Sequence, residues 1–129
     1  MTITLDIPNA ITIYSDVEIL TIVIRNLIYN AIKFTPEKGT IKISTKWEVG
    51  FFTLSVKDSG IGIDKKTLDK ISENRSSSTP GTQKETGFGL GLKLCKELLT
   101  LINGALEIES KPNAGTKMTI RLKSNPEDY

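Results

Sequence analysis

The chain has 129 residues, of which 38% are hydrophobic and 25% are charged, and its formal net charge is +2. This composition is typical of one globular domain with one hydrophobic core. Acidic and basic residues are mixed along the sequence, so no basic stripe or acidic tail indicates a nucleic acid or a membrane surface as partner. The chain contains no histidine and a single cysteine, Cys95, which excludes a catalytic triad with histidine, a histidine-ligated metal and a thiolate cluster.

The apolar stretches of the sequence are short. The runs 22–24 and 98–102 are far below the roughly 20 residues that a membrane-spanning helix needs, and no signal peptide opens the chain. We therefore expect a soluble domain without membrane contact. Cys95 lies in an apolar helical pattern, where a small buried hydrophobic side chain is favoured over a reactive thiol.

The first elements expected along the chain are strands. Apolar residues alternate over 3–7 and again over 11–13, which predicts a strand pair near the edge of a sheet. Apolar residues then recur at helical spacing from 17 to about 34, which predicts a long helix. Ser15 can cap this helix as part of a capping box, and Asp16 is an alternative cap.

The remaining pattern predicts a hairpin, two further helices and a final strand pair. The stretch from 73 to 86 holds Ser, Thr, Gly, Pro and charged residues without an apolar anchor beyond the proline, which predicts a mobile loop. The order of elements indicates an α/β fold in which one sheet carries its helices on one face. The other segments expected here are strands at 40–47 and 51–57, a helix at about 64–72, a helix at about 89–102, and strands at 105–110 and 116–123.

Three polar side chains lie on one side of the long predicted helix. Asn26 and Asn30 are four residues apart and Lys33 follows three residues later, so helical geometry aligns them. Taken alone, two asparagines in this position are more often satisfied polar residues of the core or surface. The functional alternative is an amide oxygen that binds a hard cation, with Lys33 meeting a phosphate.

A second polar motif, Asp58-Ser-Gly-Ile-Gly-Ile, follows a predicted strand. An aspartate before glycines is usually a turn residue. The functional alternative is a partly buried carboxylate that accepts a hydrogen bond from a purine amino group, while Gly60 and Gly62 let the backbone approach the base. Adenine and guanine both carry an amino group, so the carboxylate alone does not choose between them.

A third motif, Gly87-Phe-Gly-Leu-Gly-Leu, has glycine at every second position and runs into a predicted helix. Backbone N–H groups at a helix start, with glycines that allow close approach, form a cradle for an anion. The spacing differs from both the dinucleotide-binding fingerprint and the P-loop. By itself such a segment is more often a flexible turn, but after the Ser/Thr/Gly stretch it has the features of a lid over phosphates.

In this order and at these separations, the three motifs resemble the N, G1 and G2 boxes of the sensor histidine kinase ATP-binding domain, within the GHKL superfamily. The resemblance covers residues 16–122 and includes the segment after the third motif and the closing Ala114-Gly-Thr. Three ordered boxes are far more specific than any one of them. The sequence departs from the family pattern at two places. No phenylalanine stands in 68–75, where an F box is common, and Phe88 replaces a frequent threonine.

The resemblance implies a Bergerat-type two-layer α/β sandwich with a mixed sheet, helices on one face and a flexible ATP lid. Asn30 would hold Mg²⁺ with help from Asn26, Lys33 would contact phosphate, and Asp58 would bind the adenine amino group. The further nucleotide-binding positions that it implies are Gly60, Gly62, Arg75, Lys84, Gly87, Gly89, Leu90, Gly91 and Thr116.

The implied activity is transfer of the γ-phosphoryl group of Mg·ATP to a histidine. That histidine would lie on a separate phosphoacceptor and dimerisation domain of a larger sensor kinase, and a response regulator would be an indirect partner. The domain itself would be a cytoplasmic monomer, and its parent protein could be anchored in the inner membrane.

Two alternatives belong to other functional classes. An ATPase or serine kinase of the same superfamily would have a glutamate one helical turn before Asn30, but Asn26 occupies that position and an amide is not a useful general base. A non-catalytic interaction module would be favoured by the loss of a nucleotide box, but all three boxes are intact.

Overall fold

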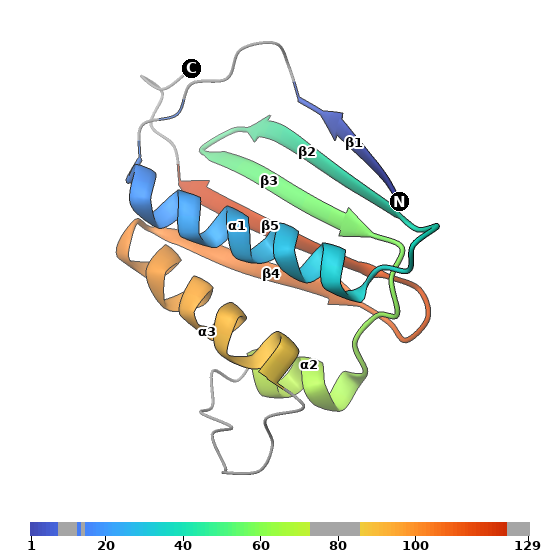
Figure 1. Cartoon of the computed structure of the whole chain (residues 1–129). Coiled ribbons are helices and arrows are strands. Elements are labelled where there is room, and N and C mark those ends of the chain that lie inside the picture. Colours follow the sequence, from blue (N-terminus) through green and yellow to red (C-terminus); the bar gives the residue numbers. More distant parts are fainter. Residues whose placement is uncertain (8–12, 14, 73–85, 124–129) are drawn as a thin grey trace.

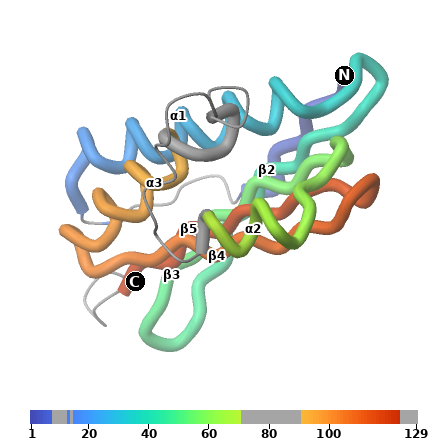
Figure 2. Tube along the Cα trace, turned by 90° about the horizontal axis from the view of Figure 1, so that it is seen from below, coloured from blue at the N-terminus to red at the C-terminus, as the bar shows by residue number. Residues whose placement is uncertain are grey.

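The computed structural model describes residues 1–7, 13, 15–72 and 86–123 of the chain. These residues form a five-stranded sheet of strand order β1-β2-β3-β5-β4. Helices α1 and α3 run side by side over one face of this sheet (Figure 1, Figure 2). The elements are β1 (Thr2–Asp6), α1 (Val17–Phe34), β2 (Thr40–Glu48), β3 (Phe51–Asp58), α2 (Lys65–Ser72), α3 (Thr86–Leu101), β4 (Gly104–Ser110) and β5 (Thr116–Lys123).

The sheet is mixed, as expected from the resemblance. β1 pairs parallel with β2, whereas the pairs β2–β3, β3–β5 and β5–β4 are antiparallel. The first strand of the predicted N-terminal pair is therefore confirmed as β1, but its partner is β2. Residues 8–12, which would form most of the second strand, lie outside the described residues, and Ile13 belongs to no strand.

Helix α1 spans the predicted residues, but its cap is Asp16 and not Ser15. The Asp16 side chain accepts a hydrogen bond from the backbone N–H of Ile19 at 2.9 Å. Asp16 directly precedes the first helical residue in an extended conformation, with φ −76° and ψ 113°. A carboxylate at that position reaches the third N–H of the helix. Its negative charge also interacts favourably with the positive end of the helix dipole.

The core lies between the two helices and the sheet. α1 contributes Val23 and Leu27, which are fully buried, and α3 contributes Leu92 and Leu99. Burial of each such side chain stabilises the fold by about 1.5–3 kcal/mol. Cys95 is also fully buried, and desolvation raises the pKa of its thiol to about 11. This confirms that Cys95 acts as a small hydrophobic residue.

Helix α3 begins earlier than the sequence pattern indicated. It starts at Thr86 and not at about residue 89, so the glycine-rich motif forms its first turns and does not precede it. The end of α3 is close to the prediction, because Asn103 adopts φ 57° and Gly104 opens the next strand. The predicted mobile loop over 73–86 lies outside the described residues, except for Thr86.

Within the described part of the chain, no helix combines the length and the apolarity that crossing a membrane requires.

Candidate functional site

Three polar residues lie in one row across the sheet at the ends of β3, β5 and β4. Asp58 is paired with Thr116, and Thr116 is paired with Ser110. Directly opposed residues of antiparallel strands project from the same face of a sheet. Val56 and Met118, two residues away on β3 and β5, are buried in the core. The row therefore lies on the helix-covered face, at one end of the core.

Asp58 is the centre of this row. Only 8% of the residue is exposed, and its Oδ1 accepts hydrogen bonds from the backbone N–H of Gly60 at 2.8 Å and of Thr116 at 3.2 Å. Desolvation raises the pKa of the Asp58 carboxyl, and the two hydrogen bonds oppose this rise because they stabilise the charged form. No described residue forms a hydrogen bond with Oδ2. The buried carboxylate therefore keeps acceptor capacity for a ligand.

The glycines around Asp58 are required by close contacts between segments of backbone. A Cβ at Gly60 would collide with the carbonyl oxygen of Phe34, and one at Gly62 would collide with that of Lys111. Gly115, with φ 81°, likewise leaves no room for a Cβ beside the carbonyl oxygen of Asp58. These contacts lock the loop after β3 between the end of α1 and the β4–β5 turn.

The same loop connects the first two sequence motifs in space. The backbone N–H of Ile61 donates to the carbonyl of Phe34, the last residue of α1, at 3.2 Å. On the other side of the loop, the N–H of Asn113 donates to the carbonyl of Ile61 at 2.7 Å. The C-terminal end of α1, with Asn30 and Lys33, is therefore held next to the loop that follows Asp58.

The α1 residues of the site have different environments. Asn30 is 6% exposed, and no described residue forms a hydrogen bond with its amide. The Nδ2 of Asn26 donates to the carbonyl of Ile22 within the helix at 2.8 Å. Its Oδ1 lies 3.0 Å from the place that a Cβ on Gly91 would occupy, so Gly91 allows α3 to approach α1 here. Lys33 is exposed, and its Nζ lies 5.4 Å from the centre of the Phe34 ring.

Several predicted site residues cannot be placed in this arrangement. Arg75 and Lys84 lie outside the described residues. Gly87, Gly89 and Leu90 belong to the first turns of α3, but the side chain of Leu90 is not described. Among the described residues, no group of three Cys, Asp or Glu side chains is close enough to hold a metal ion.

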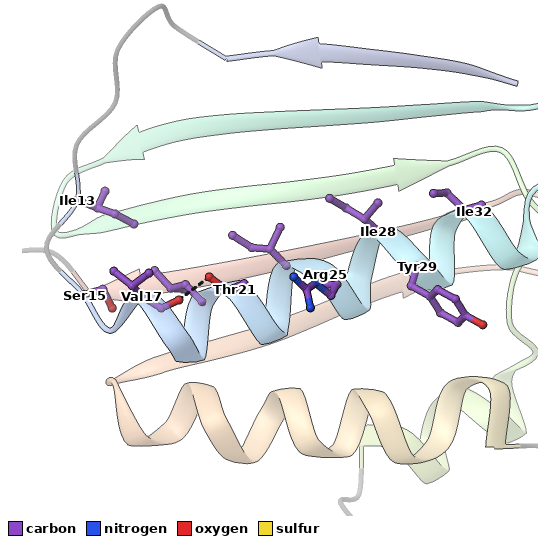
Figure 3. A pocket seen from close by; sticks show the side chains of 10 residues that line it. Ile13, Ser15, Val17, Thr21, Arg25, Ile28, Tyr29 and Ile32 are labelled. Atoms are coloured by element: carbon purple, nitrogen blue, oxygen red, sulfur yellow. Dashed lines mark hydrogen bonds between the residues drawn. The ribbon is translucent and has the colours of Figure 1, made fainter.

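A separate cavity of about 680 Å³ lies along α1 and shares no residue with the Asp58 row. Figure 3 shows Ile28 and Ile32 on the side of α1 that is turned away from α3. Apart from Ser15, Thr21, Arg25 and Tyr29, the lining side chains are aliphatic. This lining lacks the carboxylates and paired amides that polar chemistry requires, so the candidate site is the Asp58 row with the end of α1.

Sequence reasoning did not identify Ser110 as part of the site. Its Oγ lies within hydrogen-bond distance of Ile63, Gly115 and Thr116. A serine at the end of a strand carries no signal of such a role, because strands frequently end in serine. The pairing of β4 with β5 brings Thr116 to Ser110, and the loop after β3 brings Ile63.

With this geometry in view, the relatives of the chain are informative. Residues 15–126 match the family of histidine kinase-, DNA gyrase B- and HSP90-like ATPases. The chain belongs to this family. The match spans the Asp58 row, the end of α1 and the whole of α3, so the structural core and the candidate site both lie within the matched residues.

Curated relatives of the chain are named as histidine kinases. The histidine protein kinase DivJ of Caulobacter vibrioides is 31% identical over 115 residues, which are 89% of this chain and 19% of that protein. The sensor histidine kinase RcsC of Escherichia coli is 32% identical over 118 residues, 91% of this chain and 12% of RcsC. The chain therefore spans less than a fifth of the length of either relative.

Solved structures of other proteins have the same fold. The catalytic domain of histidine kinase ThkA, in a nucleotide-free form, superposes with a TM-score of 0.78 at 28% identity, covering 99% of this chain and 82% of that one. The similarity in sequence and in fold identifies this chain as a domain of the histidine kinase catalytic type.

Proposed function

We propose that this domain binds Mg·ATP and donates its γ-phosphoryl group to a histidine on a separate phosphoacceptor domain. The observation that carries the proposal is the buried Asp58 carboxylate beside the end of α1. It offers Oδ2 to a ligand, and Asn30 and Lys33 lie on the adjoining helix end.

The Asp58 end of the site suits a purine base. An ionised carboxylate only accepts hydrogen bonds, so its ligand must present a donor such as an amino group. A hydrogen bond to a charged partner in a partly buried position contributes about 1.5–3 kcal/mol. The contacts of Gly60 and Gly115 fix the position of the carboxylate, so it does not have to be ordered when the base binds.

The α1 end suits a divalent metal and phosphates. Asn30 supplies a buried amide without a described partner, and an amide oxygen is a ligand that Mg²⁺ accepts alongside phosphate oxygens. Asn26 lies one turn earlier, and Lys33 would meet a phosphate from its exposed position. Bound Mg²⁺ would neutralise negative charge on the transferred phosphoryl group. The residues of this chain contribute position and charge to the transfer.

The acceptor of the phosphoryl group must come from outside this sequence, because the chain contains no histidine. The relatives DivJ and RcsC are named histidine kinases, and the matched part is less than a fifth of the length of each. A phosphoacceptor and dimerisation domain of a parent protein would supply the histidine, and a response regulator would receive the group in turn. The proposal therefore assigns this chain the nucleotide-binding part of a two-component signalling protein.

Hydrolysis of ATP by water is the alternative reaction for this family. It needs a base near the metal site, and the position one turn before Asn30 is occupied by Asn26. The amide of Asn26 is also engaged, because its Nδ2 donates to the carbonyl of Ile22. An amide cannot accept a proton from water at neutral pH. We therefore expect hydrolysis by the isolated domain to be slow.

Calorimetric titration with ATP and GTP, each with and without Mg²⁺, tests the proposal. The Asp58→Asn variant should bind ATP about 100-fold more weakly, because an amide can place a donor where the adenine amino group needs an acceptor. Asp16→Asn is the matched control, since Asp16 also accepts a backbone hydrogen bond but caps the remote end of α1. Equal ATP affinity of Asp58→Asn and the wild type would contradict the assignment of the base site.

A second measurement tests the transfer itself. The domain is mixed with labelled ATP and a separately produced histidine phosphoacceptor domain of a related kinase. Acid-labile, base-stable label on the acceptor supports the proposal. ATP binding without any transfer to a set of such acceptors would favour a nucleotide-sensing module.

A further inference from the structure

The apolar cavity along α1 continues beneath the helix. Its outer part of about 680 Å³ follows the surface of α1, and an inner part of about 220 Å³ reaches Phe52, Ile120 and Leu122 of the sheet. The residues that line both parts are Ile13, Leu20 and Ile24. The two parts therefore form one groove, the α1 groove, which passes from the surface into the space between α1 and the sheet.

The outer part of the α1 groove leaves apolar side chains in contact with water. Val17 is 76% exposed and Ile32 is 45% exposed. Ile28, which Figure 3 shows between them on the same helix, is half-buried. Concave surfaces that are lined mainly by aliphatic side chains are typical binding sites of apolar ligands. A ligand with a hydrocarbon part would remove this surface from water.

The polar side chains of the groove determine where a charged group of the ligand would lie. Among the described residues that line the outer part, Arg25 alone carries a charge, and it forms no ion pair with another described residue. In the inner part the one polar side chain described is that of Thr45, whose buried Oγ1 has no partner. A neutral hydroxyl does not compensate for burial of a charge, whereas a guanidinium group pairs well with a carboxylate.

We propose that the α1 groove binds a long-chain fatty acid, with the hydrocarbon chain between α1 and the sheet and the carboxylate at Arg25. A peptide helix, about 10 Å wide, could cover the outer part but could not enter the inner part. An extended peptide would leave backbone groups without partners there. An unbranched hydrocarbon chain is thin and carries no such groups. The site is independent of the proposed function, since the groove shares no residue with the Asp58 row.

The first test is a titration of the full chain with octanoate, decanoate and dodecanoate at neutral pH, each below its micelle concentration. Trp47 is the single tryptophan, and its ring centre lies 4.8 Å from that of Phe52 in the inner part, so its fluorescence reports the ligand. Each added CH₂ group that is buried should strengthen binding about fourfold. Calorimetry on the same samples should give one ligand per chain.

The second test concerns the carboxylate. Arg25→Gln should weaken dodecanoate about fivefold, the effect of a surface ion pair, and should leave the affinity for dodecanol unchanged. Lys42→Gln is the matched control, because Lys42 is also an exposed cation but lies on β2 between Ile41 and Ile43, whose side chains are buried on the opposite face of the sheet. This control should leave the affinity for both ligands unchanged.

Several outcomes would overturn the inference. These are no binding of dodecanoate, an affinity that does not depend on chain length, and equal weakening of dodecanoate and dodecanol in Arg25→Gln. Sedimentation of the free chain covers a different occupant. A dimer that Ile32→Gln dissociates, together with no binding of dodecanoate, would make the groove an interface between two copies. Nucleotide titrations of the same samples judge the proposed function separately.

Discussion

The two ends of the candidate site are built differently. At the base end, Asp58, Thr116 and Ser110 are held by hydrogen bonds to backbone groups and to one another. At the metal end, Asn30 is as deeply buried as Asp58 but has no partner among the described residues. A ligand at the base end meets acceptors in fixed positions. At the metal end, the Asn30 amide has no protein partner and is available to a metal ion.

This difference has a physical basis. The Asn30 amide is not one of the described polar atoms that are fully enclosed without a partner, so it remains within reach of a ligand. A group with all its partners costs little and is positioned before the ligand arrives. We therefore expect changes at the base end to affect stability and base choice, and changes at the metal end to affect metal-dependent binding alone.

The largest effect should come from Gly115→Ala at the base end. A Cβ there would collide with the Asp58 carbonyl oxygen in a residue with φ 81°, so we expect a loss of about 3 kcal/mol in the free energy of unfolding. Gly50→Ala is the matched control, because Gly50 has φ 82° but no atom within 4 Å of the Cβ position. It should cost about 1 kcal/mol. Urea denaturation measures both, and equal losses would show that the base end is not tightly packed.

The next effect should come from Asn30→Ala at the metal end. Removal of the amide oxygen should lower ATP affinity in the presence of Mg²⁺ by about 30-fold and leave affinity without Mg²⁺ nearly unchanged. Asn30→Asp retains an oxygen ligand and should recover most of the Mg²⁺ dependence. Titrations with and without the metal provide the measurement. A variant that retains the full Mg²⁺ effect would place the metal ligand elsewhere.

The smallest effect concerns the pH dependence of stability. Burial raises the pKa of Asp58 above 3.8, so the folded protein holds this proton more tightly than the unfolded chain. The contribution of Asp58 to stability is therefore complete below pH 3.8 and is lost as the pH rises through the higher folded pKa. Asp58→Asn should remove this loss, so its stability relative to the wild type should increase as the pH rises from 3.8 to neutrality.

Asp64 is a useful comparison, because its pKa is shifted in the opposite direction. Its carboxylate accepts the backbone N–H of Thr67 at 2.7 Å, which lowers the pKa of Asp64 below 3.8. Its contribution is present above pH 3.8 and is lost as the pH falls through the lowered folded pKa. Asp64→Asn should therefore lose stability relative to the wild type as the pH rises towards 3.8, and this difference should change little from pH 3.8 to neutrality, where Asp58→Asn gains stability. The same sign for both variants would contradict the burial of Asp58 as the cause.

Much of the fold was predictable because its helices and strands follow local patterns of apolar residues. The apolar periodicity of α1 and the alternation in β2 and β3 predicted these elements to within a residue or two. The start of α3 was misjudged because glycine has a low helix propensity, and tertiary packing overrides it. Gly91, farther along α3, shows such packing, since α3 approaches α1 at Asn26 there. The choice of Asp16 over Ser15 as the cap depended on which residue directly precedes the helix.

By itself the sequence determined which chemical groups are available and the order in which they occur. It provided an Asn, Asp and Gly set in the family order, and it excluded a histidine acceptor within the chain. Tertiary structure decided which of these groups meet. Strand pairing placed Thr116 between Ser110 and Asp58, although Ser110 and Asp58 are far apart in the chain. Hydrogen-bond direction depends on such distant neighbours, and no local pattern of residues encodes it.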